Sequence, residues 1–589
     1  MPSLATVLTT STLIFSSFTA AKVCPPQGAV LPAPRAPHSN SAVKKAAEGL
    51  KATLDKRLES FQASGISIGV KSIHEDEHLF EYNLTPEIAE DIGTDKIDSD
   101  SIFRVGSLSK LVPVLGVLQQ NGVNLDDSIL EYIPELQGDS EDDELTATQW
   151  EDVTIRSLMS HMSGMATDTV FDLSLLRTAN WTDMGLPKLD PTEGLTCAGI
   201  PGTQPCGLED LVSQLSKSPP TFSPYTTPSY SNSASPLLAR VVEKVTGKKF
   251  SDAVQDTIFD EAGMKSTSFD GPVDAFETNG FVPKGDSLWN STLGVYEAAG
   301  GMWSSSNDIL SFGSAILSNK LLSKRKTRAW LQPDAFVSSS DQAVGGPWEI
   351  LRGNKLTSDD RIIDVYTKSG DMSMYHAYLA LVPEYDLVIS VLTGGVEVSK
   401  DPFARSRLLS AAVSAFVPAM EQAAREQAGS KDGQAGRYAD NKTDSTLVLE
   451  LDDGPGLRLT EFTVRGYDVL SNMDKFKLST GSAGSASLKK RQEDDVPVGE
   501  ARVYPAQRSN KNQSAWRAVF TAPMKEEDVA QLEKDSFFSD PSCITWFSID
   551  RSRYNFESIT EFVFETCGDG KVQAVSSPAF DVRFKKVGQ

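Results

Sequence analysis

Residues 102–110 read IFRVGSLSK and lead into the apolar run 111–117. If that run is helical, Ser107 and Lys110 lie on one face, one turn apart. The helix N-terminus then lies behind Ser107, where free N–H groups and the helix dipole can stabilise developing negative charge. Gly106 provides the tight turn into the helix. A buried lysine with a lowered pKa can take the serine proton without a histidine, so the stretch predicts a serine nucleophile beside its own base.

Two later segments contain polar groups suited to the same chemistry. Residues 230–232 read YSN and place a phenol and a carboxamide on the same side of a short turn. Residues 368–370 read KSG and follow the strand-like stretch 362–366. The order S-x-x-K, Y-x-N, K-[ST]-G is the signature of the penicillin-recognising serine hydrolases. The chain therefore resembles the β-lactamase and penicillin-binding-protein superfamily, and within it the class C-like and esterase branch.

The resemblance extends well beyond the three motifs. Segments 153–165 and 299–308 also look like family segments, and the matches together cover residues 45–420. The resemblance implies an α+β fold, in which a β-lactamase/transpeptidase-like catalytic domain has an antiparallel sheet flanked by helices plus a helical subdomain. Strands expected at 66–73 and 387–392 fit a sheet whose first and last strands meet. The layout is similar to that of secreted fungal β-lactamase-like proteins with an extra C-terminal domain.

The resemblance also assigns roles to individual residues. Ser107 would be the nucleophile, Lys110 the base or proton relay, and Tyr230 the base for acylation or the acid for the leaving group. The Lys368 ammonium would lower the pKa of Tyr230 and attract a substrate carboxylate. The expected substrate-binding residues are Asn232, Lys368, Ser369 and Gly370. The expected donors of an oxyanion hole are the backbone N–H groups of Ser107 and Asp371.

Three residues depart from the family pattern. Asp371 follows the KSG motif where a small or neutral residue is more usual, and an inward carboxylate there would oppose oxyanion stabilisation. Ser233 follows the YSN motif where glycine is common. Pro113 lies in the expected nucleophile helix, where it should remove a hydrogen bond and cause a kink. None of these residues replaces a catalytic group, but each bears on how a substrate fits.

A Ser–His–Asp mechanism is the alternative to the lysine–tyrosine site. His161 and His376 are the candidates, and the mechanism requires a histidine oriented by a carboxylate. His161 lies in a family segment that looks structural, and His376 follows the KSG motif and is expected to line the pocket wall. The lysine–tyrosine mechanism is therefore favoured.

The favoured function is a secreted serine hydrolase that forms an acyl-serine intermediate with an ester, amide or β-lactam. The same intermediate would also serve an acyltransferase, and a non-catalytic binding protein could retain the fold. The expected partner is a small-molecule or peptide substrate, and no cofactor or metal is expected. The net charge of −24, from 56 basic and 80 acidic residues, argues against nucleic acid and anionic membranes as partners.

Several features indicate export. Residues 1–21 resemble a signal peptide with a small-residue cleavage site. The cysteines predict two local disulfides, Cys197 with Cys206 and Cys543 with Cys567, and leave Cys24 over. Glycosylation sequons begin at five asparagines: Asn83, Asn180, Asn290, Asn441 and Asn512. These signals together predict an extracellular glycoprotein.

The chain divides by composition into several parts. We expect a signal peptide at 1–21, an extended segment at 22–41, the catalytic domain at 42–421, a linker at 422–443 and a C-terminal antiparallel β domain at 444–589. Within the last domain, strands are expected at 447–451, 457–464, 515–520, 544–549, 559–564 and 580–584. The polar loop 479–495 contains the basic triplet Lys489-Lys490-Arg491, which is either a processing site or a solvated loop.

Overall fold

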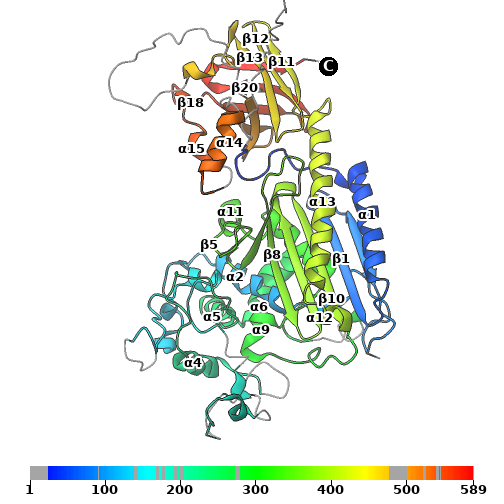
Figure 1. The fold of residues 1–589 in the computed structure, drawn as a ribbon, viewed down its shortest axis with the longest axis vertical. Helices are drawn as coiled ribbons and strands as arrows, with labels where there is room; N and C mark the ends of the chain where they lie inside the picture. The colour runs from blue at the N-terminus through cyan, green and yellow to red at the C-terminus, as the bar shows by residue number, and fades with distance from the viewer. Residues whose placement is uncertain are drawn as a thin grey trace, which may run out of the picture. The chain divides into compact units, whose positions relative to one another are not determined.

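The computed structural model is shown in Figure 1. It describes residues 24–90, 92–137, 143–167, 172–175, 180–190, 195, 197, 204–271, 279–476, 500–521, 526–538, 541, 543, 545–568 and 570–587. The expected signal peptide and the basic triplet therefore lie outside the described residues. Two compact units are present, one formed by Pro34–Ala423 and the other by Ala424–Gln589 with the N-terminal residues up to Ala33.

The larger unit is built around an eight-stranded antiparallel sheet with the strand order β2-β1-β10-β9-β8-β7-β6-β5. The strands are β1 (Ser64–Ser72), β2 (Phe80–Leu84), β5 (Ala335–Phe336), β6 (Gln342–Gly345), β7 (Trp348–Gly353), β8 (Ile363–Met372), β9 (Tyr375–Val382) and β10 (Leu387–Gly395). The first and last strands pair, with Ile68 opposite Val391. The expectation that these strands meet is confirmed.

Helices cover both faces of this sheet. Side chains alternate between the faces of a strand, so Leu379 and Leu381 face one core while Ala380 faces the other. The first core includes α10 (Ser306–Leu317), and the second includes α1 (Ser41–Leu58) and α13 (Ala404–Gly429). In α1, Asn40 caps the N-terminus, and its buried residues recur with helical spacing: Val43, Leu50, Leu54 and Leu58.

Most of the remaining helices of this unit lie beside the sheet around α2, α5 and α9, whereas α12 packs against the end of β10 (Figure 1). They are α2 (Leu111–Gln119), α3 (Ile155–Met159), α4 (Leu208–Lys217), α5 (Ala234–Thr246), α6 (Phe250–Val254), α7 (Asp260–Ala262), α9 (Glu297–Gly300), α11 (Lys324–Trp330) and α12 (Val396–Lys400). The chain enters α2 from a 3-10 helix, Gly106–Lys110, so Pro113 is the third residue of α2. An N–H in the first turn has no α-helical partner, and the hydrogen-bond loss expected at Pro113 does not occur.

The smaller unit is an antiparallel barrel. Its strands are β11 (Gly436–Asp440), β12 (Ser445–Glu450), β13 (Leu457–Val464), β14 (Tyr467–Asp468), β15 (Glu500–Ser509), β16 (Gln513–Thr521), β19 (Glu561–Thr566), β20 (Val572–Ser577) and β21 (Val582–Lys586). Each strand pairs with the next, and pairings of β11 with β12 and β21 close the ring, with β14 added beside β13. Closure removes exposed strand edges, and aromatic residues such as Phe462 and Phe562 pack in the core.

Two expectations about this part of the chain are wrong. The expected linker 422–443 contains the end of α13 and strand β11. The alanine-rich sequence before Gly429 favours a helix, although its polar residues also resemble the composition of a linker. The expected strand 544–549 is instead the short helix α15 (Thr545–Ser548). The other helix here is α14 (Glu526–Asp535), and β17 (Arg553–Tyr554) pairs with β18 (Glu557–Ser558).

The disulfides differ in part from the local pairing expected. Cys197 and Cys206 are bonded, as predicted. Cys543 pairs with Cys24 instead of Cys567, across a sequence separation of 519 residues. Cys567 lies in the turn between β19 and β20, where its N–H donates to the carbonyl of Lys571 at 3.0 Å. Tertiary folding, and not closeness in sequence, therefore selects the partner of Cys543.

Candidate active site

The nucleophile motif lies where a short strand meets a helical turn. Strand β3 (Ile102–Arg104) pairs with β4 (Trp303–Ser305) and leads into Gly106, whose φ of 54° lies in the left-handed region. A Cβ atom at Gly106 would lie 2.7 Å from the backbone N and O atoms of Asp371. Glycine therefore allows the nucleophile turn to approach the end of β8 closely. Ser107, the next residue, is half-buried.

Lys110 binds the other motif residues through its ammonium group. Its Nζ donates to Ser107 Oγ at 3.0 Å, to Asn232 Oδ1 at 2.7 Å and to the Ala299 carbonyl at 2.7 Å. The side chain is buried, with 1% exposure. Three acceptors match the three N–H donors of a protonated amine. The arrangement therefore favours the ammonium form and connects the S-x-x-K and Y-x-N motifs directly.

Tyr230 lies between two ammonium groups. Lys110 Nζ and Lys368 Nζ are 5.1 and 5.2 Å from its ring centroid. Desolvation raises the pKa of Tyr230, but the charges of Lys368 and Lys110 outweigh it, together with hydrogen bonds from Ser107 and Lys110. The net pKa lies below the usual value, so the phenolate is easier to form. The residue remains 42% exposed and accessible to a substrate.

His161 supports the YSN segment from behind. Its ring centroid is 4.6 Å from that of Tyr230, its Nδ1 accepts a hydrogen bond from Ser231 N at 3.2 Å, and its carbonyl accepts from Ser229 N at 2.8 Å. Burial, then the charges of Lys368 and Lys110, lower the pKa of His161 to about 3. Such an imidazole is neutral and a weak base at pH 7, so the geometry suits positioning better than proton abstraction.

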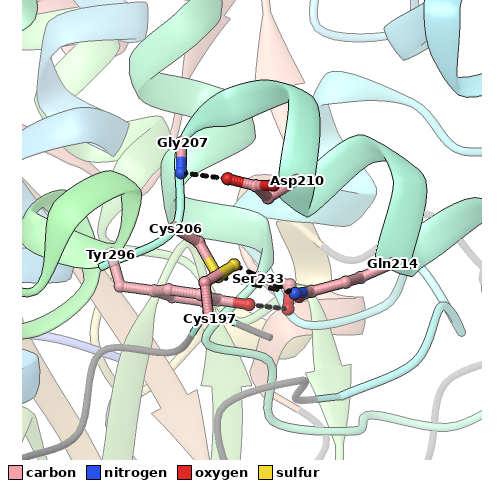
Figure 2. The surroundings of a disulfide bond; sticks show 7 residues. All are labelled: Cys197, Cys206, Gly207, Asp210, Gln214, Ser233 and Tyr296. Atoms are coloured by element: carbon pink, nitrogen blue, oxygen red, sulfur yellow. Dashed lines mark hydrogen bonds between the residues drawn. A yellow bond between two sulfur atoms is a disulfide. The ribbon is translucent and has the colours of Figure 1, made fainter. Parts of the chain in front are cut away.

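The residue after the YSN motif contacts a disulfide-braced segment. Figure 2 shows Ser233 beside Tyr296 and the Cys197–Cys206 disulfide, and the two hydroxyl oxygens are 3.3 Å apart. Gln214 Nε2 contacts both sulfur atoms, at 3.5 and 3.4 Å. Tyr296 immediately precedes α9, which contains the Ala299 carbonyl bound by Lys110. The serine that replaces the usual glycine therefore has a structural contact of its own.

The KSG motif binds Glu349, a partner that the sequence analysis did not identify. Lys368 Nζ donates to Glu349 Oε1 at 2.5 Å, Ser369 Oγ donates to the same oxygen at 2.8 Å, and Ser369 N donates to Oε2 at 2.9 Å. Glu349 lies on β7, opposite Thr367 in the pairing with β8. An acidic residue in the apolar strand sequence WEIL, residues 348–351, was the available signal.

Electrostatics keep the Lys368–Glu349 pair ionised. Burial raises the pKa of the Glu349 carboxyl, but the charge of Lys368 and hydrogen bonds from Lys368 and Ser369 lower it further, to below the usual value. Burial likewise lowers the pKa of Lys368, and the Glu349 charge outweighs this effect and raises it. Both groups therefore carry charge at neutral pH, as expected for a close, hydrogen-bonded pair.

The Asp371 carboxylate turns toward Arg405 and His376. Asp371 Oδ1 lies 2.5 Å from Arg405 Nη1 and 2.7 Å from His376 Nδ1, and the Asp371 side chain is 58% exposed. Burial raises the pKa of Asp371, but hydrogen bonds from His376 and Arg405 lower it on balance. The His376 Nε2 atom lies 3.0 Å from Ser399 Oγ on α12, so this carboxylate-oriented histidine contacts Ser399 and not the motif serine.

The end of β8 lies against the nucleophile turn. Ser369 N donates to Glu349, so it points away from β9. Strand N–H groups two residues apart point to the same side, and Asp371 N–H therefore has the same direction as Ser369 N–H. A Cβ atom at Gly370 would lie 1.9 Å from the Val105 carbonyl, which shows how closely the two backbones approach. The backbone of the nucleophile turn, which contains Ser107, and the backbone of Asp371 in β8 therefore lie against each other.

A cavity of about 400 Å³ lies elsewhere in the larger unit. Residues from α5, α9 and the segment around Asn290 line it, and none of the motif residues does. Within the described residues, no cluster of three or more His, Cys, Asp or Glu side chains has the arrangement of a metal site. The candidate site is therefore identified by the arrangement of the motif residues and not by the size of a cavity.

Comparison with known proteins places the chain in a family. Residues 51–413 match the family described as Beta-lactamase, and residues 424–588 match the family described as Beta-lactamase-like-like, C-terminal domain. The chain belongs to the β-lactamase-like hydrolase family. The expected family and the β-lactamase/transpeptidase fold, followed by a separate antiparallel β domain, are confirmed.

The chain is also similar to individual known proteins. A β-lactamase-like protein of Arthroderma benhamiae is 26% identical over 588 residues, covering 94% of each chain. The probable hydrolase clz13 of Cochliobolus lunatus is 28% identical over 454 residues, covering 72% of this chain and 71% of the other. A class C β-lactamase from Rhodobacter sphaeroides is 20% identical with a TM-score of 0.45, covering 63% of this chain and 99% of that structure.

Proposed function

We propose that the protein is a serine hydrolase that cleaves a carbonyl substrate through an acyl-Ser107 intermediate. The observation that carries the proposal is the contact of Lys110 Nζ with Ser107 Oγ and Asn232 Oδ1, beside a phenol whose pKa is lowered. Because Lys110 is arranged as an ammonium, Tyr230 is the better base. Lys110 then holds Ser107 in place and stabilises the phenolate electrostatically.

Acylation follows from this arrangement. Ser107 Oγ attacks the carbonyl carbon while its proton passes to the Tyr230 phenolate. The carbonyl oxygen takes the negative charge and is stabilised by the N–H groups of Ser107 and Asp371. The tetrahedral intermediate then collapses, the bond to the leaving group breaks, and Tyr230 returns the proton to that group. Asn232 binds the substrate amide or carbonyl, and β8 residues Ser369 and Gly370 line its path.

Deacylation repeats these steps with water. Tyr230 removes a proton from water, the hydroxide oxygen attacks the acyl carbon, and the proton returns to Ser107 Oγ as the carboxylic acid leaves. An alcohol or amine that replaced water would give acyl transfer instead. Adding a small alcohol to the assay and measuring the ester product tests which acceptor the enzyme prefers.

The nucleophile is tested with Ser107→Ala. The purified variant should lose hydrolysis of a p-nitrophenyl ester by several orders of magnitude and should not be labelled by a fluorophosphonate probe, while its melting temperature stays near that of the wild type. Ser216→Ala is a control, because Ser216 Oγ donates to the Ser213 carbonyl at 3.1 Å within α4 and Ser216 has no assigned chemical role. Peptide mass spectrometry locates the label. A label on any serine other than Ser107 would exclude the proposal.

We also propose that the protein is secreted and glycosylated. The Cys24–Cys543 and Cys197–Cys206 disulfides suit an oxidising compartment, and the five sequon asparagines are all exposed. Within the described part of the chain, no helix has both the length and the apolar character needed to cross a bilayer. Secreted protein should begin near Lys22, lose mass on deglycosylation and yield both cross-linked peptides without reductant. Reduced thiols at these four cysteines would contradict this.

A further inference from the structure

We infer that the enzyme acts on esters whose leaving group has no carboxylate, because Glu349 already occupies the carboxylate-binding groups of the site. The inference rests on the proposed acyl-enzyme function and deepens it. A carboxylate in the site would be expected to bind an ammonium, a hydroxyl and a backbone N–H. Glu349 takes this set from within the protein, through Lys368 Nζ at 2.5 Å, Ser369 Oγ at 2.8 Å and Ser369 N at 2.9 Å.

In the Lys368–Glu349 ion pair, the carboxylate is more exposed than the ammonium group. The Lys368 side chain has 0% exposure, whereas that of Glu349 has 30%. Lys110 is also buried, and the nearest exposed acidic group on β8, Asp371, is 58% exposed. A substrate entering beside β8 therefore meets the Glu349 carboxylate, and Asp371 already paired with Arg405, before it meets either ammonium group. Lys368 is already neutralised by Glu349, so a second carboxylate there would gain little attraction and would lie beside a like charge.

The proposed mechanism places the leaving group next to this pair. Tyr230 returns the proton to the leaving group, so that group must lie beside the phenol. Lys368 Nζ is 5.2 Å from the centroid of the same ring, and Glu349 is hydrogen-bonded to Lys368. A negative charge on the leaving group would therefore lie near Glu349, in a site partly shielded from water where charge repulsion is strong. A neutral leaving group avoids this repulsion.

The test compares two esters that differ only in charge. 3-Carbamoylphenyl acetate and 3-carboxyphenyl acetate have the same acyl group and leaving groups of nearly the same shape, but only the second is anionic at pH 7. Their kcat/KM values are each divided by the rate of uncatalysed hydrolysis in the same buffer. The wild type should prefer the neutral ester by about ten- to a hundredfold, as expected for one like-charge contact near a partly buried site.

Glu349→Gln keeps the shape of the side chain and removes its charge. This variant should reduce the preference for the neutral ester by about tenfold or more, because Lys368 then has no anionic partner and can bind the leaving-group carboxylate. Glu461→Gln is the matched control. Glu461 is also a strand glutamate in an ion pair, with Arg437 at 2.8 Å, but it lies in the barrel unit, and the loss of its charge should leave the preference unchanged.

The outcomes separate this inference from the proposed function. If the neutral ester is hydrolysed equally well by wild type and Ser107→Ala, the proposed function is wrong. If hydrolysis depends on Ser107 but the wild type uses the anionic ester as well as the neutral one, the inference alone is overturned, and this result needs no variant to fold. An unchanged preference in folded Glu349→Gln also overturns it, because the discrimination would then come from another group.

Discussion

Tyr230→Phe removes a single oxygen atom from the candidate site. The ring stays packed against His161, with centroids 4.6 Å apart in the parent protein, and the phenol is already 42% exposed. The loss of one partly exposed hydroxyl should cost about 1 kcal/mol or less in the free energy of unfolding. The substitution should therefore separate the chemistry of the phenol from its contribution to folding.

The expected loss of rate follows from the role of the hydroxyl. General acid–base catalysis contributes about 10²- to 10⁴-fold, which corresponds to about 3–5 kcal/mol of activation free energy. The two ammonium groups at 5.1 and 5.2 Å from the ring centroid stabilise the phenolate, so the loss should lie toward the upper part of this range. Binding of an uncleaved ester analogue should change little, because the hydroxyl acts mainly in the transition state.

The pH dependence provides a second readout. In the proposed mechanism the base is the phenolate, which forms as the pH rises through the lowered pKa of Tyr230. The wild-type acylation rate should therefore increase with pH and level off before the ordinary tyrosine pKa of about 10. Tyr230→Phe should lack this rise. Single-turnover measurements with a p-nitrophenyl ester between pH 5 and 10 give both the rate and its pH profile.

Tyr132→Phe is the control for this experiment. The Tyr132 hydroxyl donates to Asp127 Oδ2 at 3.3 Å, away from the motif residues, and its loss should change acylation by no more than about twofold. His161→Gln should be milder than Tyr230→Phe, because His161 contacts the ring and has no proton-transfer role in the proposed mechanism. Near-wild-type acylation in Tyr230→Phe together with an inactive His161→Gln would refute the lysine–tyrosine mechanism.

Two further predictions concern stability. Gly106→Ala should lower the free energy of unfolding by about 2–4 kcal/mol and reduce kcat, because its φ is 54° and the new Cβ would lie 2.7 Å from Asp371 backbone atoms; a melting temperature and kcat equal to wild type would show that the turn can relax. Burial raises the pKa of Glu384, beside Arg361, to about 8. The folded protein therefore holds this proton more tightly than the unfolded chain does, and the contribution of Glu384 to the free energy of unfolding is complete below about pH 4.5 and is lost as the pH rises through 8. Glu384→Gln should therefore stabilise the protein by a few kcal/mol at pH 9 and hardly at all at pH 4, and urea unfolding at the two pH values would expose an opposite trend.

The order of the motifs and the main strands could be predicted from sequence. The spacing of Ser107 and Lys110 sets their proximity within one helical turn, and the confirmed contact of 3.0 Å needs no distant residue. The strands expected at 66–73 and 387–392 lie close to the bounds of β1 and β10, because strand patterns depend on neighbours in the chain. The family signature also predicted the fold around them.

Tertiary structure alone decided which distant groups meet. Lys110 donates a hydrogen bond to Asn232, which lies 122 residues away in the sequence, and Cys24 bonds to Cys543 across 519 residues. Glu349 contacts Lys368 only because β7 and β8 pair in one register. The sequence pattern around a residue indicates its secondary structure and burial, but the partner of its side chain depends on how separate elements pack. The nucleophile turn could therefore be predicted from the sequence. The position of the Glu349 carboxylate beside the KSG motif, and with it the charge proposed to face a substrate, depends on the pairing of β7 with β8 in the folded sheet.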